Sequence, residues 1–118
     1  MAEKWDLENR TTEYARSVIR LCKCLPRNPI NDRLVDQLVG SSGSVRANYR
    51  EANDSLGKKD FIQRLKIARR EAKESLHWLE LILEANSNKN SEIKSLIKES
   101  EELKNILSSI IIKVEKQE

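Results

Sequence analysis

The sequence predicts an all-α protein, an antiparallel up-down-up-down four-helix bundle. Three observations carry this prediction. Charged residues make up 35% of the chain and aromatic residues only 4%, with three Gly and two Pro, which disfavours a β-sandwich or barrel. Apolar residues recur at three- and four-residue spacing in four segments, and short polar or Pro/Gly stretches separate those segments. A length of 118 residues fits one domain over residues 1–118.

The first helix is expected over residues 6–25. Its predicted buried stripe is Leu7, Thr11, Tyr14, Val18, Cys22 and Leu25. Pro26 and Pro29 follow this stripe and are expected to end the helix, because proline cannot donate a backbone hydrogen bond.

The second helix is expected over residues 31–56, with Asn31 or Asp32 as the residue that caps its first backbone amides. Its predicted stripe is Leu34, Leu38, Val45, Tyr49, Ala52 and Leu56. Gly57 closes the segment. The run from Gly40 to Ser44 is either a flexible kink or part of a continuous helix. Continuity is favoured, because the apolar pattern resumes at Val45 without a shift of phase.

The third and fourth helices are expected over residues 58–85 and 91–115. The predicted stripe of the third is Phe61, Ile62, Leu65, Ala68, Ala72, Leu76, Leu79 and Leu83. That of the fourth is Ile93, Leu96, Ile97, Leu103, Leu107, Ile110, Ile111 and Val114. The polar stretch over residues 86–90 is expected to form the turn between them.

Two groups of side chains outside these stripes predict self-association. Ile67, Trp78 and Leu81 project together from the third helix, roughly opposite its core stripe, where a monomer would leave them in water. The second helix carries a face of small residues that allows close approach of another backbone: Gly40, Gly43, Ser44 and Ala47. The alternative is a monomer with an apolar surface patch.

Basic residues are concentrated at the start of the third helix. Residues 58–74 hold seven basic and three acidic residues, whereas the whole chain has a net charge of only +3. The candidate nucleic-acid-binding residues are Arg46, Arg50, Lys58, Lys59, Lys66, Arg70 and Lys73. Such a row can follow a phosphate backbone, because each neutralised phosphate releases condensed counterions. The alternative is an ordinary solvated face in which Arg70 pairs with Glu74.

The residues required by common catalytic and metal sites are missing. His77 is the only histidine, so any Ser-His-Asp or Cys-His arrangement would have to use His77 as its base. Cys22 and Cys24 point to different sides of a helix and are expected to remain separate reduced thiols. We therefore expect no enzyme activity, no catalytic residue, no cofactor, no bound metal and no small-molecule substrate.

The chain lacks the features of an exported or membrane-spanning protein. Its first residues carry acids and no apolar h-region, which argues against a signal or transit peptide. The longest apolar run is Ile110-Ile111-Ile112, far below the roughly 20 residues that span a bilayer. A cytoplasmic location without membrane association is expected.

Several stretches of the sequence together carry a resemblance to a known family. The most specific are Ala47-Asn48-Tyr49-Arg50-Glu51-Ala52 and Lys58-Lys59-Asp60-Phe61. Further matching stretches are Asp6-Leu7, Arg10-Thr11, Val18-Ile19, Leu25-Pro26, Ser44-Val45-Arg46, Glu71-Ala72, Trp78-Leu79-Glu80-Leu81, Leu103 and Ile106-Leu107-Ser108-Ser109-Ile110. With these stretches the chain resembles the bacterial four-helix-bundle proteins encoded in intervening sequences of 23S ribosomal RNA genes. This family is in turn similar to the accessory variability protein of diversity-generating retroelements.

The resemblance implies a homopentameric ring of four-helix bundles with nucleic acid as its partner. It supplies no catalytic residue. The expected function is a non-catalytic oligomeric adaptor that contacts RNA or an RNA-protein complex through the basic residues. The alternative is a protein-interaction scaffold without direct nucleic-acid contact, in which the basic row is only a solvated face.

Overall fold

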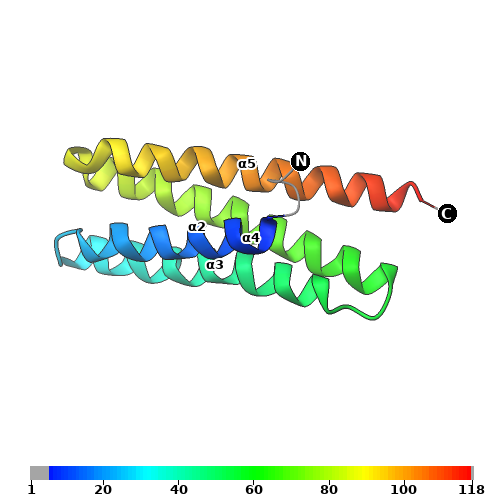
Figure 1. Ribbon diagram of the computed structural model, residues 1–118. Helices are drawn as coiled ribbons and strands as arrows, with labels where there is room; N and C mark the ends of the chain where they lie inside the picture. Colours follow the sequence, from blue (N-terminus) through cyan, green and yellow to red (C-terminus); the bar gives the residue numbers. More distant parts are fainter. Residues whose placement is uncertain (1–5, 118) are drawn as a thin grey trace.

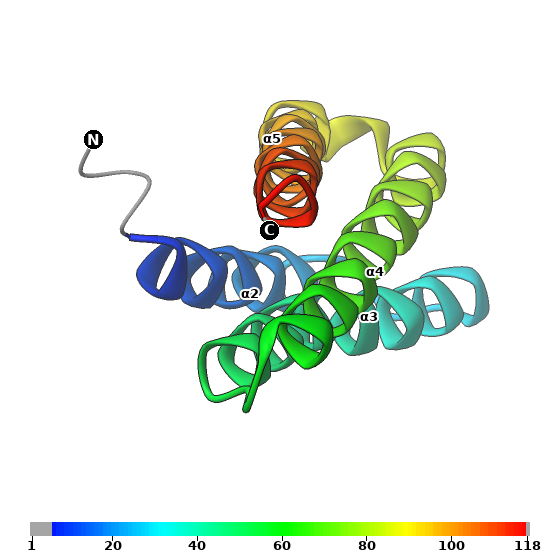
Figure 2. The same cartoon turned by 90° about the vertical axis from the view of Figure 1, so that its right-hand side faces the viewer.

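The computed structural model describes residues 6–117, which form four long antiparallel helices; residues 1–5 and 118 of the expected domain lie outside this range. The helices are α2 (Leu7–Lys23), α3 (Pro29–Asn53), α4 (Lys58–Ala85) and α5 (Asn90–Glu115), and a short 3-10 turn, η1 (Ser87–Lys89), precedes α5. They run alternately up and down in an elongated bundle of 50 × 25 × 19 Å (Figure 1). The end view in Figure 2 shows α5 above α2, with α4 running obliquely from beside α3 up to the level of α5. The predicted all-α fold is confirmed.

The four predicted stripes meet in the core. The largest side chains with less than 2% exposure come from all four helices: Leu7, Val18, Leu38, Val45, Leu65, Leu79, Ile82, Ile93, Leu103, Leu107 and Ile111. Leu56 was wrongly predicted to be buried. It is 99% exposed, because α3 ends at Asn53 and Leu56 lies in the connection to α4. Ile82, which is absent from the predicted stripe of this helix, is fully buried.

The start of α3 also differs from the prediction. Pro29 is the first helical residue rather than a helix terminator, and Asn28 is the N-cap. The Oδ1 atom of Asn28 accepts a hydrogen bond of 2.8 Å from the backbone N–H of Asn31. Proline suits the first helical position, because a backbone N–H there has no acceptor within the helix. The lack of an N–H in proline therefore removes no hydrogen bond.

Helix α3 is continuous through Gly40–Ser44, as the apolar phase predicted. Ser41 and Ser42 turn inward and are buried. Gly40 and Gly43 turn outward, and a Cβ atom added at either would meet nothing within 4 Å. Within the chain, therefore, no neighbouring backbone requires these glycines.

A buried layer of hydroxyl groups crosses the middle of the bundle, with one group from each helix. The hydroxyls of Ser41 and Ser75 are 2.8 Å apart, and Tyr14 hydrogen-bonds Ser100. Burial raises the pKa of Tyr14, whereas hydrogen bonds with Ser100 and Ser75 lower it. Ser75 and Ser100 also donate to the carbonyls of Glu71 and Leu96 in their own helices, at 2.9 and 2.8 Å. The hydrogen bonds of this layer join α3 to α4 and α2 to α5.

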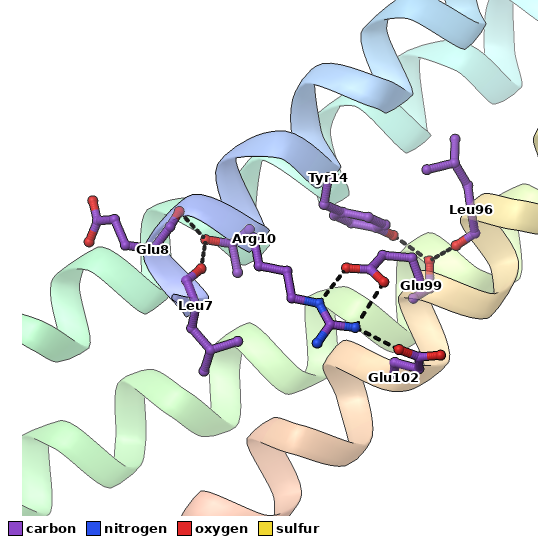
Figure 3. Close-up of polar contacts among 9 residues, drawn as sticks. Leu7, Glu8, Arg10, Tyr14, Leu96, Glu99 and Glu102 are labelled. Carbon is purple, nitrogen blue, oxygen red and sulfur yellow. Dashed lines mark hydrogen bonds and ion pairs between the residues drawn. The ribbon is translucent and has the colours of Figure 1, made fainter. Parts of the chain in front are cut away.

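An ion-pair cluster fastens α2 to α5 (Figure 3). The guanidinium group of Arg10 donates to both oxygens of Glu99, at 2.8 and 3.0 Å, and to Glu102 at 2.6 Å. The hydrogen bonds to Glu99 hold the pKa of Arg10 above its usual range, although burial opposes them. Helix α2 begins only at Leu7, and the carboxyl end of α5 extends beyond the start of α2. That end of α5 lies beside the start of α4 (Figure 1).

A reciprocal amide pair joins the two loops at the other end of the bundle. Asn31 and Asn86 each donate from Nδ2 to the other's Oδ1 at 2.9 Å. Asn31 also donates to the carbonyl of Pro26, and Asn86 to that of Ile82, at 2.9 and 3.0 Å. Both side chains are buried, so the two amides satisfy each other where water does not reach.

Asn31→Ala is expected to destabilise the protein by about 1–3 kcal/mol, because it removes the buried hydrogen bonds that Asn31 makes with the Asn86 amide and the Pro26 carbonyl. The measurement is urea unfolding followed by circular dichroism. The matched control is Asn105→Ala at an exposed position of α5, which should change the free energy of unfolding by less than about 0.5 kcal/mol. Equal effects of the two substitutions would contradict a stabilising role for the amide pair.

The two cysteines are expected to react at different rates with a thiol reagent. Cys22 is partly buried, and its desolvation raises the pKa of its thiol to about 11, so little thiolate is present at mildly alkaline pH. Cys24 is exposed. Mass spectrometry after limited alkylation should find Cys24 modified first. Preferential modification of Cys22 would mean that α2 does not pack at this point as described.

Candidate functional site

A shallow open groove of ≈ 670 Å³ runs along the outer side of α4. Its lining residues are Lys66, Arg69, Arg70, Lys73, Glu74, His77 and Trp78. They recur every three or four residues, so one face of a single helix supplies the whole site. Three of the predicted nucleic-acid-binding residues, Lys66, Arg70 and Lys73, therefore come together with two further groups that can carry positive charge, Arg69 and His77.

Arg69 and His77 were not among the predicted binding residues. The signal was present in the sequence, since Arg69 lies three residues after Lys66 and His77 four after Lys73. Arg69 donates to the hydroxyl of Ser108 on α5 at 3.4 Å, which turns it partly toward the neighbouring helix. The His77 ring meets the Trp78 ring edge-on, with 4.5 Å between their centroids.

The basic groups of this face differ in how far they are already paired. In the part of the chain that the structure describes, no ion pair involves Lys59, Arg70 or Lys73, so Arg70 does not form the alternative pair with Glu74. Lys66 pairs with Glu115 of α5, at 3.2 Å between Nζ and Oε2. Lys58 donates to the backbone carbonyl of Gln117. Lys59 is exposed on the first turn of α4 and precedes the groove.

Arg46 and Arg50 lie elsewhere, on the side of α3 that faces α2. The Nε atom of Arg46 donates to the hydroxyl of Thr12 at 2.6 Å, and Nε of Arg50 is 3.2 Å from Oε2 of Glu8. The residues of α3 that contact α4 are different ones, such as Asn48, which accepts from Arg64 at 3.3 Å. The expectation that Arg46 and Arg50 extend the basic row of α4 is therefore wrong in its geometry.

The predicted self-association residues fall into two sets with different surroundings. Trp78 is half-buried and packs against the core, so the expectation that it lies outside the core is wrong. Ile67 is half-buried, and Leu81 is 42% exposed. On α3, Gly40, Gly43 and Ala47 are exposed, whereas Ser44 is partly covered and accepts from Asn48 at 3.0 Å. Further apolar side chains are exposed on other helices: Ile19, Ile30, Val39 and Ile112.

The part of the chain that the structure describes contains neither a cluster of metal ligands nor a membrane-spanning helix. Within residues 6–117, no three His, Cys, Asp or Glu side chains are grouped so that they could hold a metal ion. None of the helices in the same range combines the length and the apolar character that crossing a bilayer requires.

Comparison with known proteins places this fold in a family. The sequence matches the family described as "23S rRNA-intervening sequence protein" over residues 3–109. A solved structure from Bacteroides thetaiotaomicron, described as a protein with unknown function from the S23 ribosomal protein family, is similar with a TM-score of 0.77 and 31% identity. The alignment covers 88% of this chain and 96% of that one. No curated protein matches the chain at a significant level. Because the family match includes nearly all of its length, the chain belongs to the 23S rRNA-intervening sequence protein family.

Proposed function

We propose that this protein is a non-catalytic oligomeric adaptor that binds RNA, or an RNA-protein complex, through the basic face of α4. The observation that carries the proposal is the groove in which Lys66, Arg69, Arg70 and Lys73 line one side of a single helix. Arg70 and Lys73 are exposed there and carry no ion pair within residues 6–117, so they can exchange water for phosphate without first losing a partner.

The geometry favours contact with the phosphate backbone rather than with bases. Lys59 and Lys73 are 14 positions apart, so the row extends for about 21 Å along a rigid helix at about 1.5 Å per residue. Trp78, the aromatic side chain at the groove, is half-buried against the core, which removes it as a free stacking platform for single strands. A straight row of cations without stacking groups suits a series of phosphates.

Assembly would strengthen this weak site. The net charge of +3 provides only modest electrostatic attraction per chain. In a homopentameric ring, the arrangement that the sequence resemblance implies, five copies of the row would be repeated by symmetry, and one RNA could reach several of them. Leu81 is the exposed apolar residue of α4 that such an interface would cover.

A protein-interaction scaffold is the second candidate. The exposure of Ile19, Val39 and Ile112 favours it, because these residues provide apolar surface on α2, α3 and α5. Salt dependence separates the two functions: binding to phosphates weakens steeply as salt is added, whereas an apolar contact does not.

The double substitution Arg70→Glu with Lys73→Glu is expected to lower the affinity for a fluorescein-labelled RNA hairpin by about tenfold, measured by anisotropy. The slope of log affinity against log salt should decrease by about 1.4–1.8, since each of the two lost phosphate contacts removes about 0.7–0.9. The matched control is Lys94→Glu with Lys98→Glu on α5, an equal charge change at exposed positions outside the groove. If both doubles bind RNA equally well, the α4 face is not the site.

Self-association is expected to give a native mass several times 13.7 kDa at micromolar concentration. Leu81→Asp should lower this mass without loss of helical content, because the side chain is 42% exposed in the single chain and a buried charge opposes assembly. Light scattering measures the mass and circular dichroism the fold. A wild-type mass that stays at one chain across all concentrations would rule out the oligomer.

A further inference from the structure

The carboxyl end of α5 occupies part of the basic row. Oε2 of Glu115 lies 3.2 Å from Nζ of Lys66, and the two side chains are 46% and 43% exposed. About two turns before Lys66 on α4, Lys58 donates a hydrogen bond to the backbone carbonyl of Gln117. Two of the predicted phosphate-binding lysines are thus already bound to oxygen atoms of their own chain.

This contact engages two of the basic residues of the row, Lys58 and Lys66. Lys58 and Lys66, on the first turns of α4, face the end of α5, whereas Arg70 and Lys73 have no such partner in the described part of the chain. This difference follows from helix lengths. Helix α5 runs to Glu115 and passes the start of α2, so that its last turn reaches the beginning of α4 (Figure 1).

The oxygen atoms involved resemble those of the proposed ligand. A carboxylate and a carbonyl oxygen accept hydrogen bonds from an ammonium group as a phosphate oxygen does, and a lysine ammonium has only three protons to donate. Both contacts lie at the surface, where an ion pair is weak and exchanges readily with solvent. Glu115 neutralises the charge of Lys66 and repels an approaching phosphate, so a polyanion binds Lys66 more strongly when it displaces Glu115.

We propose that the last turn of α5 is an internal competitor that limits RNA binding at the α4 row, an inference that rests on the proposed function. Arg70 and Lys73 engage phosphates first. The contacts of Glu115 with Lys66 and of Gln117 with Lys58 are replaced only by an RNA that is long enough to follow the row toward the start of α4.

The test compares full-length Glu115→Gln with the wild type in binding a labelled RNA hairpin across a salt titration. Glutamine keeps the size of the side chain but removes the charge that holds Lys66. The affinity should rise about twofold to fivefold at low salt, the range set by a surface ion pair. The salt slope should steepen by about 0.7–0.9, the value of one added phosphate contact.

Two matched variants identify the cause. Asp36→Asn makes the same charge change at an exposed position of α3, so it reports any general effect of a more positive net charge. In a Lys66→Ala background, Glu115→Gln should give no gain beyond that control, because the lysine for which they compete is absent. Circular dichroism should show that all variants keep their helical content.

Each outcome separates this inference from the proposed function. If the wild type binds RNA and Glu115→Gln binds no better than Asp36→Asn, internal competition is overturned while RNA binding stands. If neither the wild type nor Glu115→Gln binds, RNA binding itself fails and the competitor role falls with it. If only Glu115→Gln binds measurably, both proposals are supported.

Discussion

The hydroxyl layer in the middle of the bundle is the interaction on which the register of the helices depends. Tyr14, Ser41, Ser75 and Ser100 come from four different helices and are all buried. Moving α2 or α5 by a turn would separate the buried Tyr14 hydroxyl from Ser100. A buried hydroxyl that loses its partner costs about 1–3 kcal/mol, a penalty that apolar packing alone does not impose. The leucine and isoleucine side chains supply most of the burial, and the hydroxyls select one alignment among those that apolar packing would tolerate.

That alignment decides where the charged side chains lie. With α5 held against α2 by Tyr14 and by Arg10, the end of α5 is carried past Leu7 to the beginning of α4. Glu115 then meets Lys66, and the outer face of α4 is left with Arg70 and Lys73 toward solvent. The basic face and its partial neutralisation are consequences of one packing arrangement, although their residues are far apart in the sequence.

Periodicity was sufficient to predict the four helices, most of the core and the continuity of α3, because each depends on contacts repeated along one helix. Features that depend on the surroundings of a single residue, such as a helix cap or the direction of one side chain, were harder to predict from the sequence. Asn28, Asn31 and Asp32 are all good capping residues. In the structure the side chain of Asn31 is paired with Asn86, and Asn28 is the residue that caps α3. Arg46 lies one residue after the buried Val45, about 100° around the helix, and the sequence does not state which neighbour occupies that side. The half-burial of Trp78 likewise depends on how α3 lies against α4.

If RNA binds the α4 row as proposed, internal competition gives a weakly charged protein a means of discriminating among anions. A small anion offers one contact and must displace Glu115 from Lys66 alone, whereas a long polyanion is first held by Arg70 and Lys73 and then competes at high local concentration. The cost of displacing an exposed ion pair is small enough for such a ligand to overcome and large enough to weaken single contacts. In a ring the same step would be repeated in every subunit, so the preference for long ligands would increase with the number of rows that one RNA reaches. The low net charge then acts in favour of selectivity, because it keeps general attraction for anions weak while a correctly spaced series of phosphates still binds.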